Sequence, residues 1–327
     1  MKEEILRLLK DSKGEFISGE KISERFGVSR AAIWKYINAL KEEGYEIESV
    51  PRRGYRIVSS PDILTYEEVK GYLKTRFMGR DICYFDTIDS TNIKAKELAM
   101  CKAEGTVVIS EEQTLGRGRM GRNWISPKGK GIWMSLILKP KIGPMKVAKI
   151  TQIGAAAVNL ALNDLGIQSF VKWPNDIVIN GKKVCGILTE MSCELNMINY
   201  VVMGMGINVN LDKEDFQDEV SKVGTSLKVE TGKFVDRKKL LGVFLNRFEE
   251  LYIPFVEEDN FKDTLNVCRE NSILIGKEVK IIRGDEEKKG KVLDIDEEGE
   301  LVVSYEDGRI ENVLSGEVSV RGIYGYV

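Results

Sequence analysis

The segment from Gly116 to Trp124, GRGRMGRNW, carries three arginines that alternate with three glycines and ends on a tryptophan. Glycine lets a backbone pass close to a ligand, and the arginine guanidinium is a fixed fork of donors that matches a carboxylate or a phosphate. The composition of the segment therefore favours a loop that closes over an anion, and it is poorly suited to a hydrophobic core. The chain contains no histidine, which excludes a Ser-His-Asp triad and a His-ligated metal.

Polar residues also gather in the segment 86–92, DTIDSTN, before an amphipathic helix that begins near Ile93. Helix capping is the commoner use of such residues. Ser90, Thr91 and Asn92 nevertheless exceed what one cap requires, and the surplus groups can bind a small polar ligand at the helix N-terminus. This segment alone does not decide between the two uses.

Three further features lie nearer the C-terminus. The segment 172–176, KWPND, has good turn chemistry, but its Asp176 could also bind Mg²⁺, which takes one or two carboxylates together with substrate phosphates. Lys183 follows the hairpin signal Asn180-Gly181, and it matters only if its strand faces the same cleft. The strand-end segment 204–210, GMGINVN, carries Asn208, whose amide could bind an adenine edge.

The elements around these segments predict a multidomain α+β protein. Across residues 65–270, apolar strands alternate with helices, which predicts an α+β domain with a central mixed sheet. A capping box is expected at Thr65. The strands expected are Val107–Ser110, Ile132–Leu138, Ser169–Trp173 and Tyr200–Met205, and the long helices Lys146–Leu165 and Asp236–Phe255. Residues 272–327 alternate in short strands with turns and predict a small β-barrel.

Residues 1–60 predict a winged helix-turn-helix domain. Ser29 is the expected N-cap of a helix that ends near Glu43, and a hairpin follows around the turn 51–54. Short helices of a larger helical layer remain the alternative, and the acidic residues at 42, 43, 46 and 48 argue against DNA. The residues expected to contact DNA are Ser29, Arg30, Trp34, Lys35 and Asn38 on the helix, and Arg52 and Arg53 at the hairpin tip.

Composition narrows the classes of protein. The 327 residues are 43% hydrophobic and 31% charged, which is ordinary for a soluble protein, and the net charge of −2 requires any DNA site to be a local patch. The five cysteines form no CxxC pair, so reduced thiols and no bound transition metal are expected. A charged N-terminus and the lack of a long apolar run predict a cytoplasmic protein.

Together, the segments GRGRMGRNW, STN, KWPND with the following GKKVCGI, and GMGINVN resemble the biotin protein ligase family in order and spacing. The terminal domains resemble those of its longer bacterial type, the bifunctional biotin ligase and biotin operon repressor, so that the C-terminal barrel should be SH3-like. The resemblance covers nearly the whole chain. It implies that biotin and ATP, with Mg²⁺, form biotinyl-5′-adenylate, and that the biotinyl group then passes to a lysine of a biotin carboxyl carrier protein.

The resemblance also implies repression of biotin synthesis genes, with the adenylate as corepressor and an adenylate-bound homodimer on operator DNA. Lys183 and Arg119 are the catalytic residues that it implies, and Asp176 is a candidate magnesium ligand. Met120 departs from the arginine that many family members carry there. The residues expected to bind biotin or the adenylate are Ser90, Thr91, Asn92, Gln113, Gly116, Arg117, Gly118, Arg119, Arg122, Trp124, Lys183, Gly186, Asn208 and Arg321.

Three alternatives remain open on the residues. One is another acyl-adenylate ligase, acting on lipoate or an octanoyl group. The second is a biotin-sensing transcription factor without ligase activity. The third is a ligase whose N-terminal domain no longer binds DNA.

Overall fold

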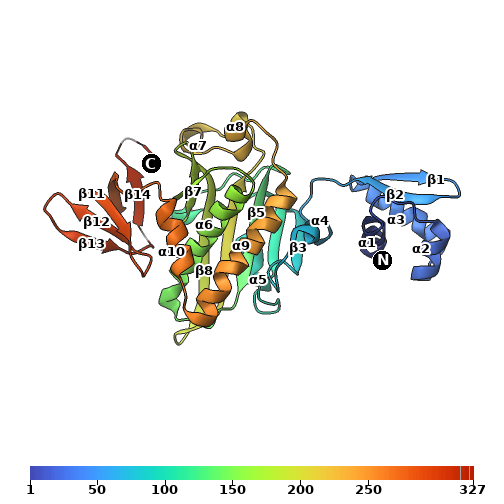
Figure 1. Cartoon of the computed structure of the whole chain (residues 1–327), viewed down its shortest axis with the longest axis horizontal. Helices are drawn as coiled ribbons and strands as arrows, with labels where there is room; N and C mark the ends of the chain where they lie inside the picture. Colours follow the sequence, from blue (N-terminus) through green and yellow to red (C-terminus); the bar gives the residue numbers. More distant parts are fainter. Residues whose placement is uncertain (317, 324) are drawn as a thin grey trace. The chain divides into compact units, whose positions relative to one another are not determined.

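Three short helices and a hairpin make up the first of two compact units, Met1–Ile63 (Figure 1). The computed structural model describes residues 1–316, 318–323 and 325–327. The elements of this unit are α1 Lys2–Asp11, α2 Gly19–Phe26, α3 Arg30–Glu42, β1 Glu46–Val50 and β2 Gly54–Ser59. The predicted N-cap is confirmed, because the Ser29 side chain accepts a hydrogen bond from the Ala32 N–H at 3.2 Å. Ile33, Ile37 and Leu40 of α3 lie in the core, as their helical spacing predicts.

A seven-stranded mixed sheet organises the second unit, Leu64–Val327. The strand order is β3-β4-β5-β9-β8-β7-β6, with β3 and β4 parallel and every other pair antiparallel. Its strands are β3 Ile82–Ile88, β4 Val107–Gln113, β5 Gly131–Leu138, β6 Phe170–Lys172, β7 Asp176–Ile179, β8 Lys182–Glu194 and β9 Met197–Asn208. The α-helices are α4 Tyr66–Val69, α5 Thr91–Leu98, α6 Val147–Asp164, α7 Asp218–Val223, α8 Leu227–Thr231, α9 Arg237–Glu258 and α10 Lys262–Glu270.

Side chains alternate between the two faces of this sheet, as they must in a strand. Met203 and Ile207 of β9 belong to the main core, which α6 and α9 cover (Figure 1). Val202, one residue earlier, packs on the other face with Ala95 and Ala99 at α5. Even-numbered residues of β9 therefore lie on the α5 face, and this parity places the glycines at 204 and 206 there as well.

The predicted long helices and strands are confirmed to within a few residues at their ends, but the capping box at Thr65 is wrong. The Thr65 side chain forms no cap hydrogen bond, and α4 is a single turn. Glu68, which would complete the box, lies 3.6 Å from the Lys238 ammonium instead. Glu68 thus contacts the long helix α9 and does not form the local capping box.

The C-terminal strands form a five-stranded antiparallel sheet in the order β13-β12-β11-β10-β14. They are β10 Glu278–Arg283, β11 Glu286–Ile295, β12 Leu301–Tyr305, β13 Ile310–Val313 and β14 Val318–Gly322. The Gly299 carbonyl accepts hydrogen bonds from the Trp173 indole at 2.9 Å and the Gln152 amide at 2.7 Å. These bonds tie the sheet to α6 and to the KWPND turn.

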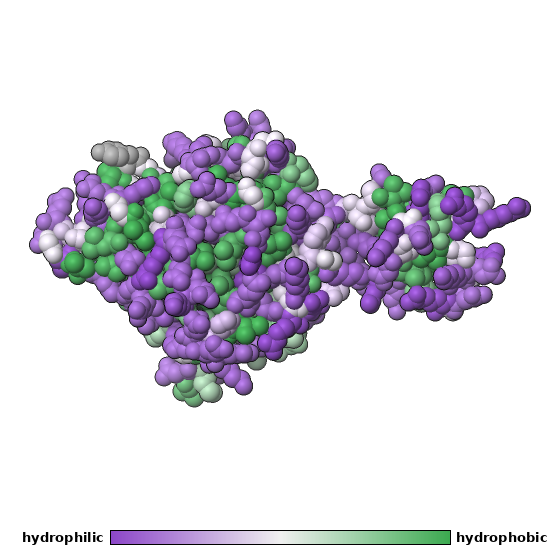
Figure 2. Space-filling view, in the orientation of Figure 1, coloured by the Kyte–Doolittle hydropathy of each residue, from purple (hydrophilic) through white to green (hydrophobic). Residues whose placement is uncertain are grey.

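Hydrophilic residues cover most of the face in Figure 2. None of the helices in the described part of the chain is long and apolar enough to cross a lipid bilayer.

Candidate functional site

A pocket of about 240 Å³ lies on the α5 face of the mixed sheet. It lies between the segment Gly116 to Trp124, called the Gly/Arg loop below, and the KWPND turn. It brings together segments that are far apart in the chain, from Ser90 before α5 to Arg321 in β14 and Tyr326 near the C-terminus. The expected site residues that line it are Ser90, Thr91, Asn92, Gln113, Arg117, Gly118, Arg119, Arg122, Trp124, Asp176, Lys183, Gly186, Asn208 and Arg321.

Gly116 is the one expected substrate-binding residue that does not line the pocket. Its carbonyl accepts a hydrogen bond from the Trp124 N–H at 2.9 Å, and a Cβ at Gly116 would lie 2.4 Å from the Trp124 carbonyl oxygen. The two arms of the Gly/Arg loop therefore approach each other too closely for a side chain at this position. Gly116 shapes the base of the loop.

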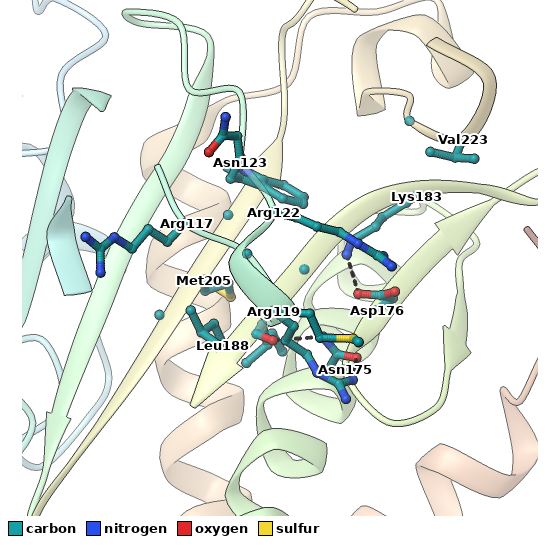
Figure 3. A pocket seen from close by; sticks show the side chains of 18 of the residues that line it. Arg117, Arg119, Arg122, Asn123, Asn175, Asp176, Lys183, Leu188, Met205 and Val223 are labelled. Atoms are coloured by element: carbon teal, nitrogen blue, oxygen red, sulfur yellow. Dashed lines mark hydrogen bonds and ion pairs between the residues drawn. The ribbon is translucent and has the colours of Figure 1, made fainter. Parts of the chain in front are cut away.

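The Gly/Arg loop folds back on itself as a tight turn. The Gly118 N–H donates to the Arg122 carbonyl at 2.7 Å, and Met120 at the tip has a φ of +55° and a mostly exposed side chain. In Figure 3, Arg117 points away from the ion pair of Lys183 and Asp176, whereas Arg122 points toward it. The arginines of one loop thus reach opposite ends of the pocket.

Lys183, at the start of β8, does face the cleft. Its ammonium lies 2.5 Å from the Asp176 carboxylate (Figure 3). It also lies 5.1 Å from the centre of the Trp124 ring. A Cβ at Gly186 would lie 2.7 Å from Cε of Lys183, so the glycine leaves room for the lysine side chain. Lys183 therefore contacts both the KWPND turn and the end of the Gly/Arg loop.

Arg119 joins the loop to the turn and to the C-terminal sheet. Its guanidinium donates to the Asn175 side chain at 2.9 Å, to the Val318 carbonyl at 3.0 Å, and to the Gly316 carbonyl. The Asn175 amide in turn donates to the Ile187 carbonyl at 2.9 Å. Burial lowers the pKa of Arg119. In this structure Arg119 holds three separate segments around the pocket.

The residues at the start of α5 form the other end of the pocket. Ser90 occupies the N-cap position and is buried, yet its side chain forms no cap hydrogen bond. The Thr91 N–H and hydroxyl lie 2.9 Å and 3.1 Å from the Gln113 side-chain oxygen, and the Gln113 amide donates to Ser126 at 2.9 Å. Capping of α5 therefore does not account for these side chains, which line the pocket.

Trp124 and Asn208, which the sequence predicts to contact the adenine, both line the pocket. The Trp124 indole packs on Gly206, where a Cβ would come within 2.2 Å of its nitrogen. Its buried N–H meets no acceptor among the residues that the structure describes. Asn208 donates to the Thr225 carbonyl at 3.0 Å. A buried indole N–H without a partner is costly, and a ligand acceptor in the pocket would satisfy it.

Two further residues that line the pocket were not predicted as site residues. Lys172 is buried with its ammonium 3.3 Å from the centre of the Tyr326 ring, and burial lowers the pKa of Lys172 to about 7. The Tyr326 hydroxyl donates to Asp176, and burial raises the pKa of Tyr326. Lys172 was visible as the first residue of KWPND. Nothing in the sequence around Tyr326 marks it.

Positive charge dominates the pocket. Arg119, Arg122, Lys172, Lys183 and Arg321 line it, together with Arg117, whereas Asp176 is the single acidic residue among its described lining residues. Across the described chain, no group of three or more cysteine, aspartate or glutamate side chains forms a metal cluster. The pocket is suited to an anionic ligand. A metal ion bound here would take most of its oxygen ligands from that ligand.

The DNA-contacting residues predicted in the first unit lie on its surface. Trp34 is 59% exposed, and Arg30 is exposed beside Glu20, with 3.8 Å between their charged groups. At the hairpin tip, Arg52 has a φ of +67° and an exposed side chain, whereas the Arg53 guanidinium stacks on the Phe16 ring at 4.3 Å. The Arg52 side chain is therefore more available than that of Arg53 for contacts outside the domain.

Three family models match the chain. The biotin/lipoate A/B protein ligase family matches residues 84–208, an HTH domain matches residues 2–56, and the biotin protein ligase C terminal domain matches residues 274–321. A solved structure of biotin protein ligase from Aquifex aeolicus in complex with biotin and ATP covers 74% of this chain and 99% of its own, with a TM-score of 0.65 and 31% identity.

Curated relatives extend the similarity along the whole chain. The bifunctional ligase/repressor BirA of Bacillus subtilis is 40% identical over 98% of this chain and 98% of its own length. The protein of the same name from Escherichia coli is 30% identical over 95% of this chain and 94% of its own. The chain therefore belongs to the family of bifunctional biotin ligases and repressors.

Proposed function

We propose that this protein activates biotin with ATP and transfers it to a lysine of a biotin carboxyl carrier protein. The observation that carries the proposal is one pocket lined by the Gly/Arg loop, KWPND, Lys183 and the STN segment, with one carboxylate among many cations. Neutralisation of charge at a carboxylate and a phosphate is what adenylation requires. The family, which pairs this pocket with a helix-turn-helix domain, supports the same assignment.

In the first step, the biotin carboxylate oxygen bonds to the α-phosphorus of ATP and pyrophosphate leaves. No strong base is needed, because the nucleophile is already an anion, and catalysis consists of positioning and charge stabilisation. Arg117 and Ser90 lie at the end of the pocket proposed for biotin. Lys183 and Arg122 lie toward the end proposed for the phosphates, and the free N–H of Trp124 lies between β9 and the loop.

Asp176 fits a magnesium ion that arrives with the nucleotide. Mg²⁺ binds proteins through one or two carboxylates and takes its other oxygens from phosphates and water, and this pocket offers one carboxylate beside its cations. When bound, the ion would neutralise the departing pyrophosphate. Asp176 would hold it, after release from Lys183 and Tyr326, its present partners.

In the second step, the ε-amine of the carrier lysine bonds to the acyl carbon of biotinyl-5′-adenylate and AMP leaves, giving an amide. The test is incubation of the protein with biotin, ATP, Mg²⁺ and a carrier domain, followed by mass spectrometry of that domain. A mass increase of one biotinyl group supports the proposal. Labelling with lipoate or octanoate alone would establish the rival acyl-adenylate ligase, and an unmodified carrier would favour a sensor without ligase activity.

We also propose a second role for the winged helix-turn-helix domain. The exposed Trp34 and Arg52 support binding to operator DNA, with biotinyl-5′-adenylate as corepressor and a homodimer on an inverted-repeat operator. Repression would act on biotin synthesis genes, in the cytoplasm. Residues 1–60, 65–270 and 272–327 would be the DNA-binding, catalytic and C-terminal domains. Sedimentation analysis with and without biotin and ATP tests the dimer, and an unchanged mass would refute the coupling.

A further inference from the structure

The Asn92 side chain lies on the pocket floor in a position that the sheet register determines. Ser135 of β5, Gly204 of β9 and Leu188 of β8 are direct cross-strand neighbours on the α5 face. A Cβ at Gly204 would lie 1.9 Å from the Asn92 amide oxygen. The carboxamide therefore occupies the space that the missing side chain of Gly204 leaves, with Ser135 on one side and β8 on the other.

Both ends of this carboxamide have protein partners. The amide nitrogen donates to a Glu190 carboxylate oxygen at 2.9 Å, and the amide oxygen lies 2.6 Å from the Ser135 hydroxyl, which is fully buried. The other Glu190 oxygen lies 2.6 Å from the ammonium of Lys96, one turn after Asn92 on α5. Burial alone would raise the pKa of Glu190, but hydrogen bonds from Lys96 and Asn92 hold it below its ordinary value.

The charge of Glu190 fixes the direction of the hydrogen bonds that follow. An ionised carboxylate only accepts, so Asn92 must turn its NH₂ toward Glu190 and its oxygen toward Ser135. Ser135 has one hydrogen and gives it to that oxygen. The Thr91 hydroxyl, 2.9 Å from Ser135 and 3.1 Å from Gln113, then has an acceptor on each side. Its hydrogen is engaged, so Thr91 offers lone pairs to the pocket.

We propose that Glu190 and Ser135 are positioning residues that orient the Asn92 carboxamide and so make the pocket floor an acceptor for ligand N–H groups. The inference rests on the proposed biotin ligase function, with the ring system of biotin at this end of the pocket. Biotin carries N–H donors on that ring, whereas lipoyl and octanoyl groups carry none. A site built to pair with a polar group discriminates strongly against analogues that lack it.

Glu190→Met tests the proposal, because it keeps the length of the side chain and removes the acceptor. The variant loses the hydrogen bond between Asn92 and Glu190. Such a loss costs about 1–1.5 kcal/mol, which predicts a roughly tenfold rise in the biotin KM. The ATP KM and kcat should stay within about twofold. Glu190→Gln retains an acceptor and should restore the biotin KM to within about threefold of the parent value. Lys94→Met, which removes a lysine of α5 that pairs with Glu97 and leaves the Lys96–Glu190 pair in place, is the control and should change the biotin KM little.

Ser135→Ala is the second variant, in case Glu190→Met fails to fold by thermal melting, and it should also raise the biotin KM selectively. Gln113→Ala reports independently on whether biotin lies at this end. If Gln113→Ala raises the biotin KM and neither positioning variant does, the positioning role is refuted. If none of the three raises it, the placement of biotin is wrong. An equal loss in Glu190→Met and Glu190→Gln, or a fall in kcat alone, would also overturn the proposal.

Discussion

The Lys183 ammonium forms an ion pair with Asp176 at 2.5 Å while it lies over the Trp124 ring. One cation thus contacts residues that line the pocket from the KWPND turn and from the Gly/Arg loop. When a nucleotide enters, its phosphate oxygens compete with Asp176 for this lysine. The ion pair therefore holds the Lys183 ammonium at the place where negative charge is proposed to develop during adenylation.

Removal of that charge should slow adenylation. For Lys183→Met we expect a fall of about 10²–10³-fold in the rate of biotin-dependent ATP–pyrophosphate exchange, the usual effect of deleting a donor to a developing oxyanion. Lys182→Met is the matched control, because Lys182 is the neighbouring residue on the same strand and is exposed. Equal rates in the Lys183 variant and the control would remove Lys183 from the mechanism.

Nucleotide binding should take up a proton through Lys172. Burial lowers its pKa to about 7, so much of it is neutral at pH 8 in the empty pocket. Phosphate oxygens favour the charged form and raise this pKa. Calorimetry at pH 8 in two buffers of different ionisation enthalpy should show the uptake, and Lys172→Met should abolish it. A buffer-independent binding enthalpy for the parent protein would contradict this account.

The same pKa has a consequence for stability. The folded-state pKa of Lys172 lies below the ordinary value of 10.5. Between about pH 7 and 10.5, the unfolded chain therefore binds more protons at this residue than the folded chain does. The contribution of Lys172 to stability accordingly rises with pH across that window and is least favourable below it.

The Tyr326 hydroxyl should compete with Mg²⁺ for Asp176, to which it donates a hydrogen bond. Tyr326→Phe keeps the ring beneath Lys172 and removes only the hydroxyl. We expect half-maximal pyrophosphate exchange at a Mg²⁺ concentration several-fold lower, since one neutral hydrogen bond contributes about 1 kcal/mol. Tyr305→Phe, in the C-terminal sheet away from the pocket lining, is the control. A higher Mg²⁺ requirement in Tyr326→Phe would show that the hydroxyl assists the ion.

Arg52 should contribute one phosphate contact to DNA binding. Its exposed side chain at the hairpin tip predicts that Arg52→Ala weakens binding to all sequences alike and reduces the salt slope by about one. Arg53 stacks on Phe16, so Arg53→Ala should also lower the melting temperature of the domain. Ligase activity should be unchanged in Arg52→Ala. An unaltered salt slope in filter-binding titrations would exclude the contact.

Features that depend on neighbouring residues could be predicted from the sequence better than contacts between distant residues. Ser29 as a cap and the Ile33–Ile37–Leu40 stripe depend on neighbours within one helix, and local spacing predicts both. Lys183 was ambiguous until the structure placed it on the same face as Trp124. The pairing of β7 with β8 shifts register between Lys183 and Cys185, which reverses the alternation at this point of β8. A sequence pattern alone gives neither the register between two strands nor such a shift.

Residues that depend on distant partners could not be predicted. In the sequence, Glu190 is an ordinary polar residue on a strand. Its proposed role depends on its hydrogen bond with Asn92, almost a hundred residues earlier. The low pKa of Lys172 requires burial beneath Tyr326, near the other end of the chain. At Thr65, by contrast, a convincing local motif failed because α9 engages Glu68. Tertiary contacts decided all three cases.

Gly204 and Gly206 have a consequence for the design of inhibitors. Each faces the pocket without a side chain, and Asn92 and Trp124 occupy the space so released. A methyl group at position 204 would displace the carboxamide, and one at 206 would displace the indole. Resistance to a pocket-filling inhibitor is therefore hard to acquire on β9, because a larger residue there obstructs the natural substrates too. Compounds that contact the Asn92 and Trp124 side chains above this strand should keep their potency longest.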